Sequence, residues 1–379
     1  NNNVPAAAQV ADEKYLRPVG GPWGFFQRMR VLCAGQLVED IMDYNRIHQM
    51  MHVLIAPESR SNDAAEAFGI SDDQYRAKTA NECPGIAGGK SMTVLFKPLS
   101  GILGQNKMLP LRYAPITLEL ELVNDSNAPI ISDLTSGGSD PFTAATTSVD
   151  WSITNVQVKC DVCTLDNALD NSYAQHLLSG KSLPISYNTF VSQMQTVAGP
   201  NVAVNVSRAL TRLKSVFVTL QKSGYNTRKN FVRKDWNDFF SPMSKPSSVD
   251  NNGYFKHDPD GEFEFQLQIG SKLFPEYPVR SHNEAHYQLK KTLGVQASAV
   301  HNFDINAIEF RDYKFILGTD CEKVLEAGFT GLNTRAGDLM TVKFKNVGSN
   351  AQYQAERLHI VLHSDQIMEI KDTGVAVFD

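Results

Sequence analysis

Cysteine is scarce in this sequence, and its arrangement argues against a disulfide framework. Five Cys occur in 379 residues, an odd number at wide spacings, whereas disulfide-stapled proteins carry an even number at regular spacings. Cys160 and Cys163 form a CxxC pair, but the segment around them reads as a strand, on which residues three apart face opposite sides. We therefore expect neither a disulfide nor a zinc ion there, and the composition is typical of a reducing compartment.

Long apolar runs and excess positive charge are also lacking. No apolar run approaches the roughly 20 residues that a membrane-spanning helix needs, and no secretory signal is visible. The formal net charge is −5, which argues against a surface that binds nucleic acid through its phosphates. We therefore expect no direct, sequence-specific nucleic-acid binding. The chain begins NNNVPAAA without an initiator Met, which we interpret as a processed or trimmed product.

Catalytic and nucleotide-binding motifs are incomplete. Residues 83–91 read CPGIAGGKS, but Pro84 stands where a phosphate-binding loop requires its first Gly. A second GKS at residues 180–182 has Gln175 in that position. No GxSxG nucleophile elbow occurs, and no nucleophile–base pair can be read from the sequence. We therefore predict that the chain is not an enzyme.

Histidine spacing gives only weak signals for a metal site. Pairs four residues apart are His48 and His52, His282 and His286, and His359 and His363. This spacing can chelate zinc on a helix, but in the first two pairs the Glu that follows the first His in metalloproteases is absent. The last pair lies on an expected strand, where four residues span about 13 Å. We predict no metal site and no cofactor.

The sequence does contain alternation of apolar and polar residues with a period of two. Residues 116–122 read ITLELEL and residues 263–269 read FEFQLQI, so in each segment the apolar side chains share one face. Pro115 stands at the start of the first segment, where its missing N–H does least harm to a strand ladder. Two such amphipathic strands, one in each half of the chain, predict two antiparallel β units.

The clearest helix signal lies in the middle of the chain. Asp166 can cap a helix over residues 166–178, in which apolar residues recur every four positions, and Gly180 follows as a stop. Since this helix separates two β-rich halves, we place the domain boundary there. The expected domains are residues 1–165, a helical connector at 166–180, and residues 181–379.

Short strands, two further helices and polar loops are expected elsewhere. The helices are residues 42–56 and residues 281–293, the second with a capping box of Ser281 and Glu284. The expected strands are residues 25–33, 36–41, 91–99, 115–123, 151–164, 183–197, 202–210, 213–222, 262–270, 305–315, 328–332, 339–345, 352–362, 366–370 and 374–378. The long loops are residues 57–90, 126–147 and 223–261. Many short strands with turn signals indicate sandwiches or barrels.

Several segments, taken in order, resemble a known family. They read WGFFQRMRVLCAGQLVEDI (23–41), LPLRYAPITLELELVND (109–125), LDNALDNSYAQHLLSGKSLPI (165–185), IGSKLFPEYPVRSHNEAHYQL (269–289), FTGLNTRAGDLMTVKFKN (329–346) and IMEIKDTGVAVF (367–378). As an ordered set they resemble the double jelly-roll major capsid proteins of eukaryotic DNA viruses, most of all those of polinton-like viruses and virophages.

The resemblance implies a fold and a function. The fold is all-β, with two consecutive jelly-roll β-sandwich domains and a few short helices. Such chains form homotrimers in which two jelly rolls per subunit make a pseudo-hexameric capsomer, and these capsomers tile an icosahedral shell. The first half shows fewer strands than an eight-stranded jelly roll, so strands that would precede Trp23 are expected to be missing.

The resemblance also implies partners and a location. The expected partners are further copies of the chain, neighbouring capsomers, and penton and minor capsid proteins. The expected location is the capsid shell of the virion, after assembly in the cytoplasm or nucleus of the host cell. Contact with a membrane beneath the shell is left open.

Two apolar stretches are candidates for contacts between subunits. Both carry large side chains in segments too irregular for core strands. The candidate residues are Trp236, Phe239 and Phe240 in one stretch and Phe274, Pro275 and Tyr277 in the other. The alternative is that these residues close the ends of their own sandwich. The rival function is a lectin-like or cupin-like carbohydrate-binding protein, because jelly rolls occur in those classes too.

Overall fold

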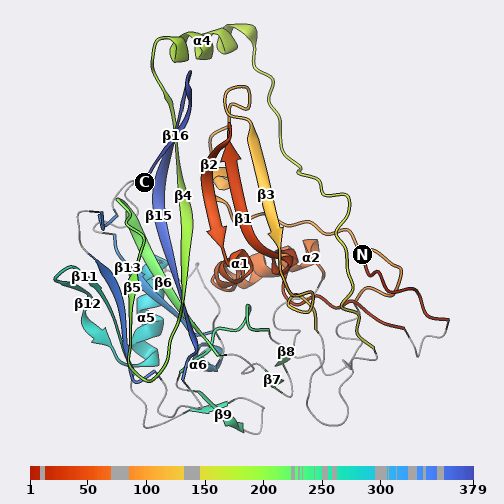
Figure 1. The fold of residues 1–379 in the computed structure, drawn as a ribbon, viewed down its shortest axis with the longest axis vertical. Coiled ribbons are helices and arrows are strands. Elements are labelled where there is room, and N and C mark those ends of the chain that lie inside the picture. Colours follow the sequence, from red (N-terminus) through yellow and green to blue (C-terminus); the bar gives the residue numbers. More distant parts are fainter. Residues whose placement is uncertain are drawn as a thin grey trace.

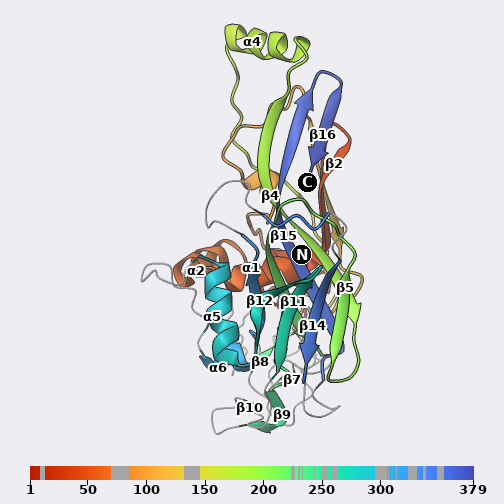
Figure 2. The same cartoon turned by 90° about the vertical axis from the view of Figure 1, so that its left-hand side faces the viewer.

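The computed structural model shows a mostly β chain with a few short helices. The described residues are 1–8, 13–69, 85–131, 146–222, 227–228, 231–232, 234–242, 244–249, 255–257, 263–294, 305, 307–312, 314–322, 331–335, 339–347 and 354–379. Among them, no helix is long and apolar enough to cross a membrane. The helix α4 (Asn167–Leu178) lies at one end of the long axis, and the short strands β9 (Ser244–Val249) and β10 (Phe255–His257) lie at the other (Figure 1 and Figure 2).

The first sheet consists of three antiparallel strands that precede α4. β1 (Phe26–Cys33) and β2 (Gln36–Met42) form a hairpin, and β3 (Ile116–Leu122) pairs with the other side of β1, giving the order β2-β1-β3. Ala34 and Gly35 at the turn both have positive φ, the conformation that matches the twist of two paired strands. The hairpin and the strand at residues 116–122 are confirmed.

Short helices surround this sheet. The 3-10 helix η2 (Pro22–Phe25) leads into β1, and α1 (Tyr44–Val53) follows β2 with almost all of its residues buried. This confirms the helix expected at residues 42–56. α2 (Pro57–Glu66) occupies the start of the expected loop at residues 57–90, of which residues 70–84 lie outside the described residues. α3 (Gly101–Gly104) precedes β3.

A long strand near the C-terminus organises the largest sheet. β15 (Arg357–Lys371) pairs along one side with β4 (Leu183–Thr196), and along the other with β6 (Leu213–Gln221) and then β16 (Gly374–Phe378). β13 (Ile316–Asp320) extends the sheet beyond β6. The strands expected at residues 352–362 and 366–370 are therefore one continuous strand.

A second sheet in this half has the order β12-β11-β14-β5. Its strands are β12 (Lys272–Val279), β11 (Glu264–Ile269), β14 (Met340–Lys345) and β5 (Val202–Val206). The helix α5 (His282–Thr292) follows β12, and Ser281 Oγ accepts the N–H of Glu284 at 3.2 Å as the capping box predicts. Within the segment expected as a loop at residues 223–261, the described residues also form β7 (Thr227–Arg228), β8 (Phe231–Val232), β9 and β10.

Three expected strands are wrong. Residues 305–315 contain the helix α6 (Ala307–Asp312). Residues 91–99 and 151–164 pair with no strand among the described residues, apart from a single bridge between Asn2 and Trp151. A strand needs a partner for its backbone hydrogen bonds, and the alternation within one segment says nothing about that partner.

In the second half, β12 and β13 (Ile316–Asp320) were not expected either. β12 contains Pro275 and Pro278, which made the segment look irregular in the sequence. Both prolines are tolerated because β12 is at the edge of its sheet, where one row of N–H groups needs no partner.

One hydrophobic core runs through both halves of the chain. Its buried side chains come from β1, β2 and α1 in the first half and from β6, β11, β13 and β15 in the second. A small separate cluster contains Leu16, Phe25, Ile86 and Ile130. Because the two β-rich halves share one interior, the division into domains at residues 165 and 166 stays a prediction.

Candidate functional site

Arg46 joins the two halves of the chain. It lies on α1 in the first half, and its side chain is buried among residues of the second half. The guanidinium donates to Thr219 Oγ1 (3.1 Å), Leu220 O (3.1 Å), Asp235 O (2.9 Å) and Asp238 O (3.1 Å). Burial lowers the pKa of Arg46 to about 10, so the group remains charged at neutral pH. A buried cation with this many acceptors holds α1 against the second half.

Side-chain hydrogen bonds also join β2 of the first half to β4 of the second. The Tyr187 hydroxyl, on β4, lies 3.0 Å from Val38 O and 2.8 Å from Gln366 Oε1. Ser192 Oγ donates to Met42 O at 2.8 Å. β2 and β4 share no backbone ladder in the described part of the chain, so their facing edges are connected through side chains alone.

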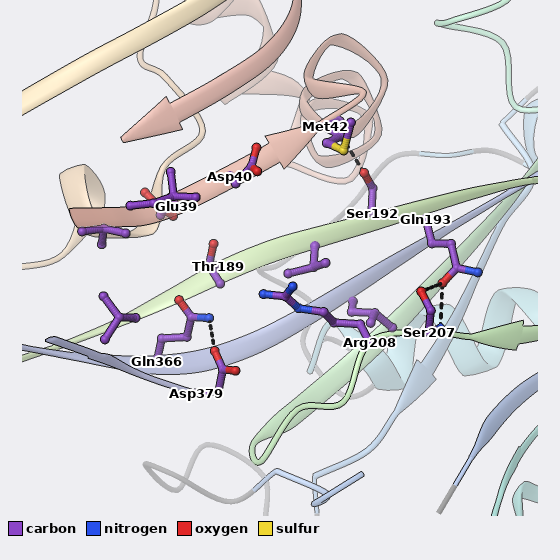
Figure 3. Close-up of a pocket in the computed structure, with 15 residues that line it drawn as sticks. Glu39, Asp40, Met42, Thr189, Ser192, Gln193, Ser207, Arg208, Gln366 and Asp379 are labelled. Carbon is purple, nitrogen blue, oxygen red and sulfur yellow. Dashed lines mark hydrogen bonds between the residues drawn. The ribbon is translucent and has the colours of Figure 1, made fainter. Parts of the chain in front are cut away.

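A pocket of about 470 Å³ lies between these two strands (Figure 3). Its walls come from β2 in the first half and from β4, β15 and β16 in the second, together with the residues that follow β5. The lining residues labelled in Figure 3 are Glu39, Asp40, Met42, Thr189, Ser192, Gln193, Ser207, Arg208, Gln366 and Asp379. Figure 3 shows Arg208 in the midst of this group, and Gln366 donates to Asp379 Oδ1 at 2.6 Å.

Glu39 is a buried carboxylate in the wall of the pocket. Its oxygens accept hydrogen bonds from Ser100 Oγ, from Gly101 N at 2.9 Å and from Ile102 N at 3.3 Å. Burial raises the pKa of Glu39 above its ordinary value, although the hydrogen bonds to Ser100 and to the two amides oppose the rise. The carboxylate therefore ties the first turn of α3 to β2.

Two serines in the wall of the pocket bond to groups that are not bases. A nucleophile requires a base within hydrogen-bond reach. Among the described lining residues, Ser192 donates to a main-chain carbonyl and Ser207 Oγ donates to Gln193 Oε1 at 3.1 Å, and neither contacts a His or a carboxylate. These contacts are typical of a structural junction between two parts of one chain.

The histidine pairs take part in packing. His48 stacks on Trp23 with ring centroids 4.2 Å apart, its Nε2 lies 3.2 Å from Lys97 O, and burial lowers its pKa to about 3. In the second pair, His282 and His286 both contact the ring of Phe310. In the third pair, His359 contacts the side chain of Gln221, and His363 contacts the side chain of Ser215. In the described part of the chain, no three or more His, Cys, Asp or Glu side chains are grouped to hold a metal ion.

Comparisons with known proteins concern the fold. No protein-family profile and no curated protein matches the sequence. PBCV-1 VP54, fitted into a cryo-EM reconstruction of the virophage Sputnik, matches with a TM-score of 0.56 and 11% identity over 96% of this chain and 88% of that chain. The PBCV-1 virus capsid in a quasi-atomic model matches with a TM-score of 0.51 and 12% identity, with the same coverage. The Faustovirus major capsid protein matches with a TM-score of 0.57 and 9% identity over 94% of this chain and 74% of that chain.

The chain has the fold of these capsid proteins. The likeness extends over both β-rich halves, since the two PBCV-1 structures each match 96% of the chain. The expected fold class, all-β and of the double jelly-roll type with a few short helices, is confirmed.

In this capsid-protein fold, one of the two candidate contact stretches is in the interior. Trp236, Phe239 and Phe240 are 8%, 0% and 0% exposed, and Trp236 Nε1 donates to Ala128 O in the first half at 2.8 Å. Their large side chains fill the junction between the halves of their own chain. This corrects the expectation that they contact a neighbouring subunit, because burial leaves them almost no surface to offer.

The other candidate stretch lies on the edge strand β12. Phe274 and Pro275 are half-buried, whereas Tyr277 is 81% exposed and carries the largest exposed ring of the three. Their contact with a neighbouring subunit stays a prediction.

Sequence reasoning did not identify Arg46, a residue that joins the halves. The sequence does show a single arginine in the mostly apolar helix expected at residues 42–56, which is a hint that the side chain has a special role. The groups that accept its hydrogen bonds are more than 170 positions away in the sequence, so they could not be identified.

Proposed function

We propose that this chain is a structural major capsid protein, which trimerises into pseudo-hexameric capsomers that tile an icosahedral shell, and that it is not an enzyme. The observation that carries the proposal is the likeness of fold to PBCV-1 VP54 and to the Faustovirus major capsid protein over 96% and 94% of the chain. Fold alone does not determine function, so the buried junction at Arg46, which joins the two halves, serves as a supporting observation.

The proposed trimer is held by contacts between different faces of neighbouring subunits, as in any cyclic assembly. Its candidate residues are Phe274, Pro275 and Tyr277 on the edge strand β12. Three chains of net charge −5 bring 3 × (−5) = −15 formal charges together, so apolar and hydrogen-bonded contacts must outweigh Coulomb repulsion. Obligate interfaces of this kind bury about 2,000 Å² or more. Neighbouring capsomers, penton and minor capsid proteins, and a location in the virion shell belong to the same proposal.

Light scattering of the purified chain at micromolar concentration tests this function. The expected mass is three times 42.0 kDa, or about 126 kDa, and it should persist across moderate salt. Negative-stain images should show particles with a pseudo-hexagonal outline. A mass of 42.0 kDa at every salt concentration would contradict the proposal and favour the lectin-like alternative.

A further inference from the structure

Residues 155–165 form an exposed stretch without a partner strand. The stretch begins at Asn155, which has a positive φ of 55°, and runs to α4 as the yellow-green trace on the right of Figure 1. Every side chain in it is exposed, and its backbone makes no hydrogen bond to any other described residue. An extended backbone in this state presents two unpaired rows of N–H and C=O groups to a partner.

The apolar side chains of this stretch alternate and share one face. They are strongly exposed: Val156 by 73%, Val158 by 71% and Val162 by 72%. Cys160 has the same parity and therefore shares their face, whereas Lys159 and Asp161 point to the opposite face. An exposed row of β-branched residues on an unpaired backbone is a template for pairing with another strand.

Residues 158–162, VKCDV, are complementary to a reversed copy of themselves. When two such stretches run antiparallel with Cys160 at the centre, Val158 lies opposite the partner's Val162, and Lys159 lies opposite the partner's Asp161. We propose that residues 155–165 are a self-association site, at which two copies of this chain pair as antiparallel strands about a two-fold axis through Cys160.

Charge complementarity identifies a second copy of the chain as the occupant. Opposite charges that face each other across antiparallel strands stabilise the pair, and like charges weaken it. The two-fold axis repeats the Lys159–Asp161 pair on both sides of Cys160, so one contact gains two such pairs and two valine pairs. A contact of this kind is isologous and is complete with two copies.

This site is independent of the trimer proposed above. A cyclic trimer closes on itself through heterologous contacts, and its candidate residues on β12 are different from residues 155–165. Repetition of one weak contact at several positions strengthens an assembly without any new type of contact. The strand pairing therefore supplies a link between closed trimers.

Cross-linking through Cys160 tests the pairing. Opposed Cβ atoms in antiparallel strands are about 4.5–5.5 Å apart, close to the separation in a disulfide. The full-length chain, with Cys83 replaced by Ser, is treated with diamide, which takes up two electrons and two protons as two thiols form a disulfide. Cys33 and Cys321 are buried, so Cys160 and Cys163 are the exposed described thiols. The product is a covalent dimer of twice 42.0 kDa, about 84 kDa, on a non-reducing gel.

Cys163 provides the matched control, because the pairing places it opposite Gln157 of the other copy. Cys163→Ser should give dimer at the rate of the parent protein, and Cys160→Ser should give it about tenfold more slowly. Equal rates for the two variants would mean random collision of exposed thiols and would overturn the proposal. Absence of dimer from both variants would overturn it as well and would assign the stretch to a different occupant.

Exchange of the two charges gives a second, independent readout in the Cys163→Ser background. Lys159→Asp or Asp161→Lys alone places like charges opposite each other and should slow dimer formation about fivefold. The double variant Lys159→Asp with Asp161→Lys restores the opposed pairs and should restore the rate. A rate of dimer formation that stays low in the double variant would contradict the two-fold pairing. So would single variants that form dimer as fast as the parent protein. Because these side chains are exposed, thermal melts of all variants should coincide. Light scattering reports the trimer separately, so failure of either proposal is recognised on its own.

Discussion

The guanidinium of Arg46 lies over the ring of Phe239, 4.9 Å from its centroid, although the two residues belong to different halves of the chain. The ring covers the face of the cation, while Thr219 and main-chain carbonyl oxygens accept its N–H groups. An arginine can occupy such a place because its planar fork presents donors in several directions at once. The junction between the halves therefore includes one side chain that a lysine cannot replace.

Arg46→Met should lower the free energy of unfolding by about 3 kcal/mol, because the carbonyl oxygens around Arg46 lose their donors in a buried site. Arg28→Met is the matched control. Arg28 forms a bidentate pair with Asp40 at 2.7 Å on the partly exposed side of β1, and surface pairs contribute less than about 1 kcal/mol. Urea denaturation of both variants measures the difference. Similar losses in the two variants would show that Arg46 does not hold the halves together.

The loss of stability caused by substitutions in the two alternating strands, β3 and β11, should follow the burial of the replaced side chain. Phe265→Asp should abolish folded protein, since Phe265 is buried on β11 and an unpaired charge there costs several kcal/mol. Leu118→Asp should cost less, because Leu118 on β3 is half-buried. Glu119→Lys should change stability by less than about 1 kcal/mol, since it loses only an exposed pair with Arg30 at 2.9 Å. Thermal denaturation of the three variants gives the order, and equal stabilities would mean that the strand register is wrong.

Acid should destabilise the fold through His48. Unfolded, this histidine binds a proton near its ordinary pKa of 6.5, whereas burial lowers the pKa in the folded state to about 3. The unfolded state therefore binds more protons between these values, so the stabilisation is complete above pH 6.5 and is lost as the pH falls toward 3. One such group contributes a loss of about 3 kcal/mol between pH 6.5 and pH 4.

The His48 effect is isolated by comparing slopes of unfolding free energy against pH. His48→Gln should flatten the slope between pH 6.5 and pH 4 relative to the parent protein, even if its stability at neutral pH is lower because the stacking on Trp23 is lost. His176→Gln, on α4, controls for the removal of an imidazole elsewhere. A parent-like slope in His48→Gln would rule out His48 as the source of acid sensitivity.

Tyr277→Asp should weaken the proposed trimer without unfolding the subunit. The ring is 81% exposed on the edge strand β12, so its replacement costs the monomer little. Removal of a large aromatic side chain from the centre of an interface typically raises the dissociation constant tenfold or more. For Tyr277→Asp we expect a rise of about tenfold. Tyr287→Asp, on α5 and 55% exposed, is the control. Analytical ultracentrifugation measures the dissociation constant of the trimer for both variants. Equal dissociation constants would exclude β12 from the interface.

Local signals in the sequence predicted local structure well. The alternation at β3 and β11 could be recognised because a strand with one buried face has apolar residues at every second position, whatever its partner strand is. The capping box of α5 was readable because Ser281 and Glu284 are three residues apart. A local signal can still be incomplete, since Asp166 stands at the N-cap position of α4 but its side chain makes no capping hydrogen bond there.

Long-range partners could not be predicted from the sequence. Residues 156–162 alternate as β3 does, yet no described strand pairs with them, because a ladder depends on a second segment. β12 was missed because prolines are compatible with an edge strand and incompatible with a central one, and edge position is decided by the whole sheet. Arg46 and Leu220 bond across 174 positions, a pairing that no pattern in either segment records.

The unbroken pairing of β15 with β4 determines how this chain bears a mechanical load. Arg357 faces Thr196 and the register continues without a shift to Ile370 opposite Leu183, and both strands run close to the long axis (Figure 1). A pull along that axis loads these backbone hydrogen bonds in shear, all at the same time, because the bonds lie across the strands. They share the force and cannot open one after another, so this strand pair resists extension along the direction that leads from the β9 end to α4.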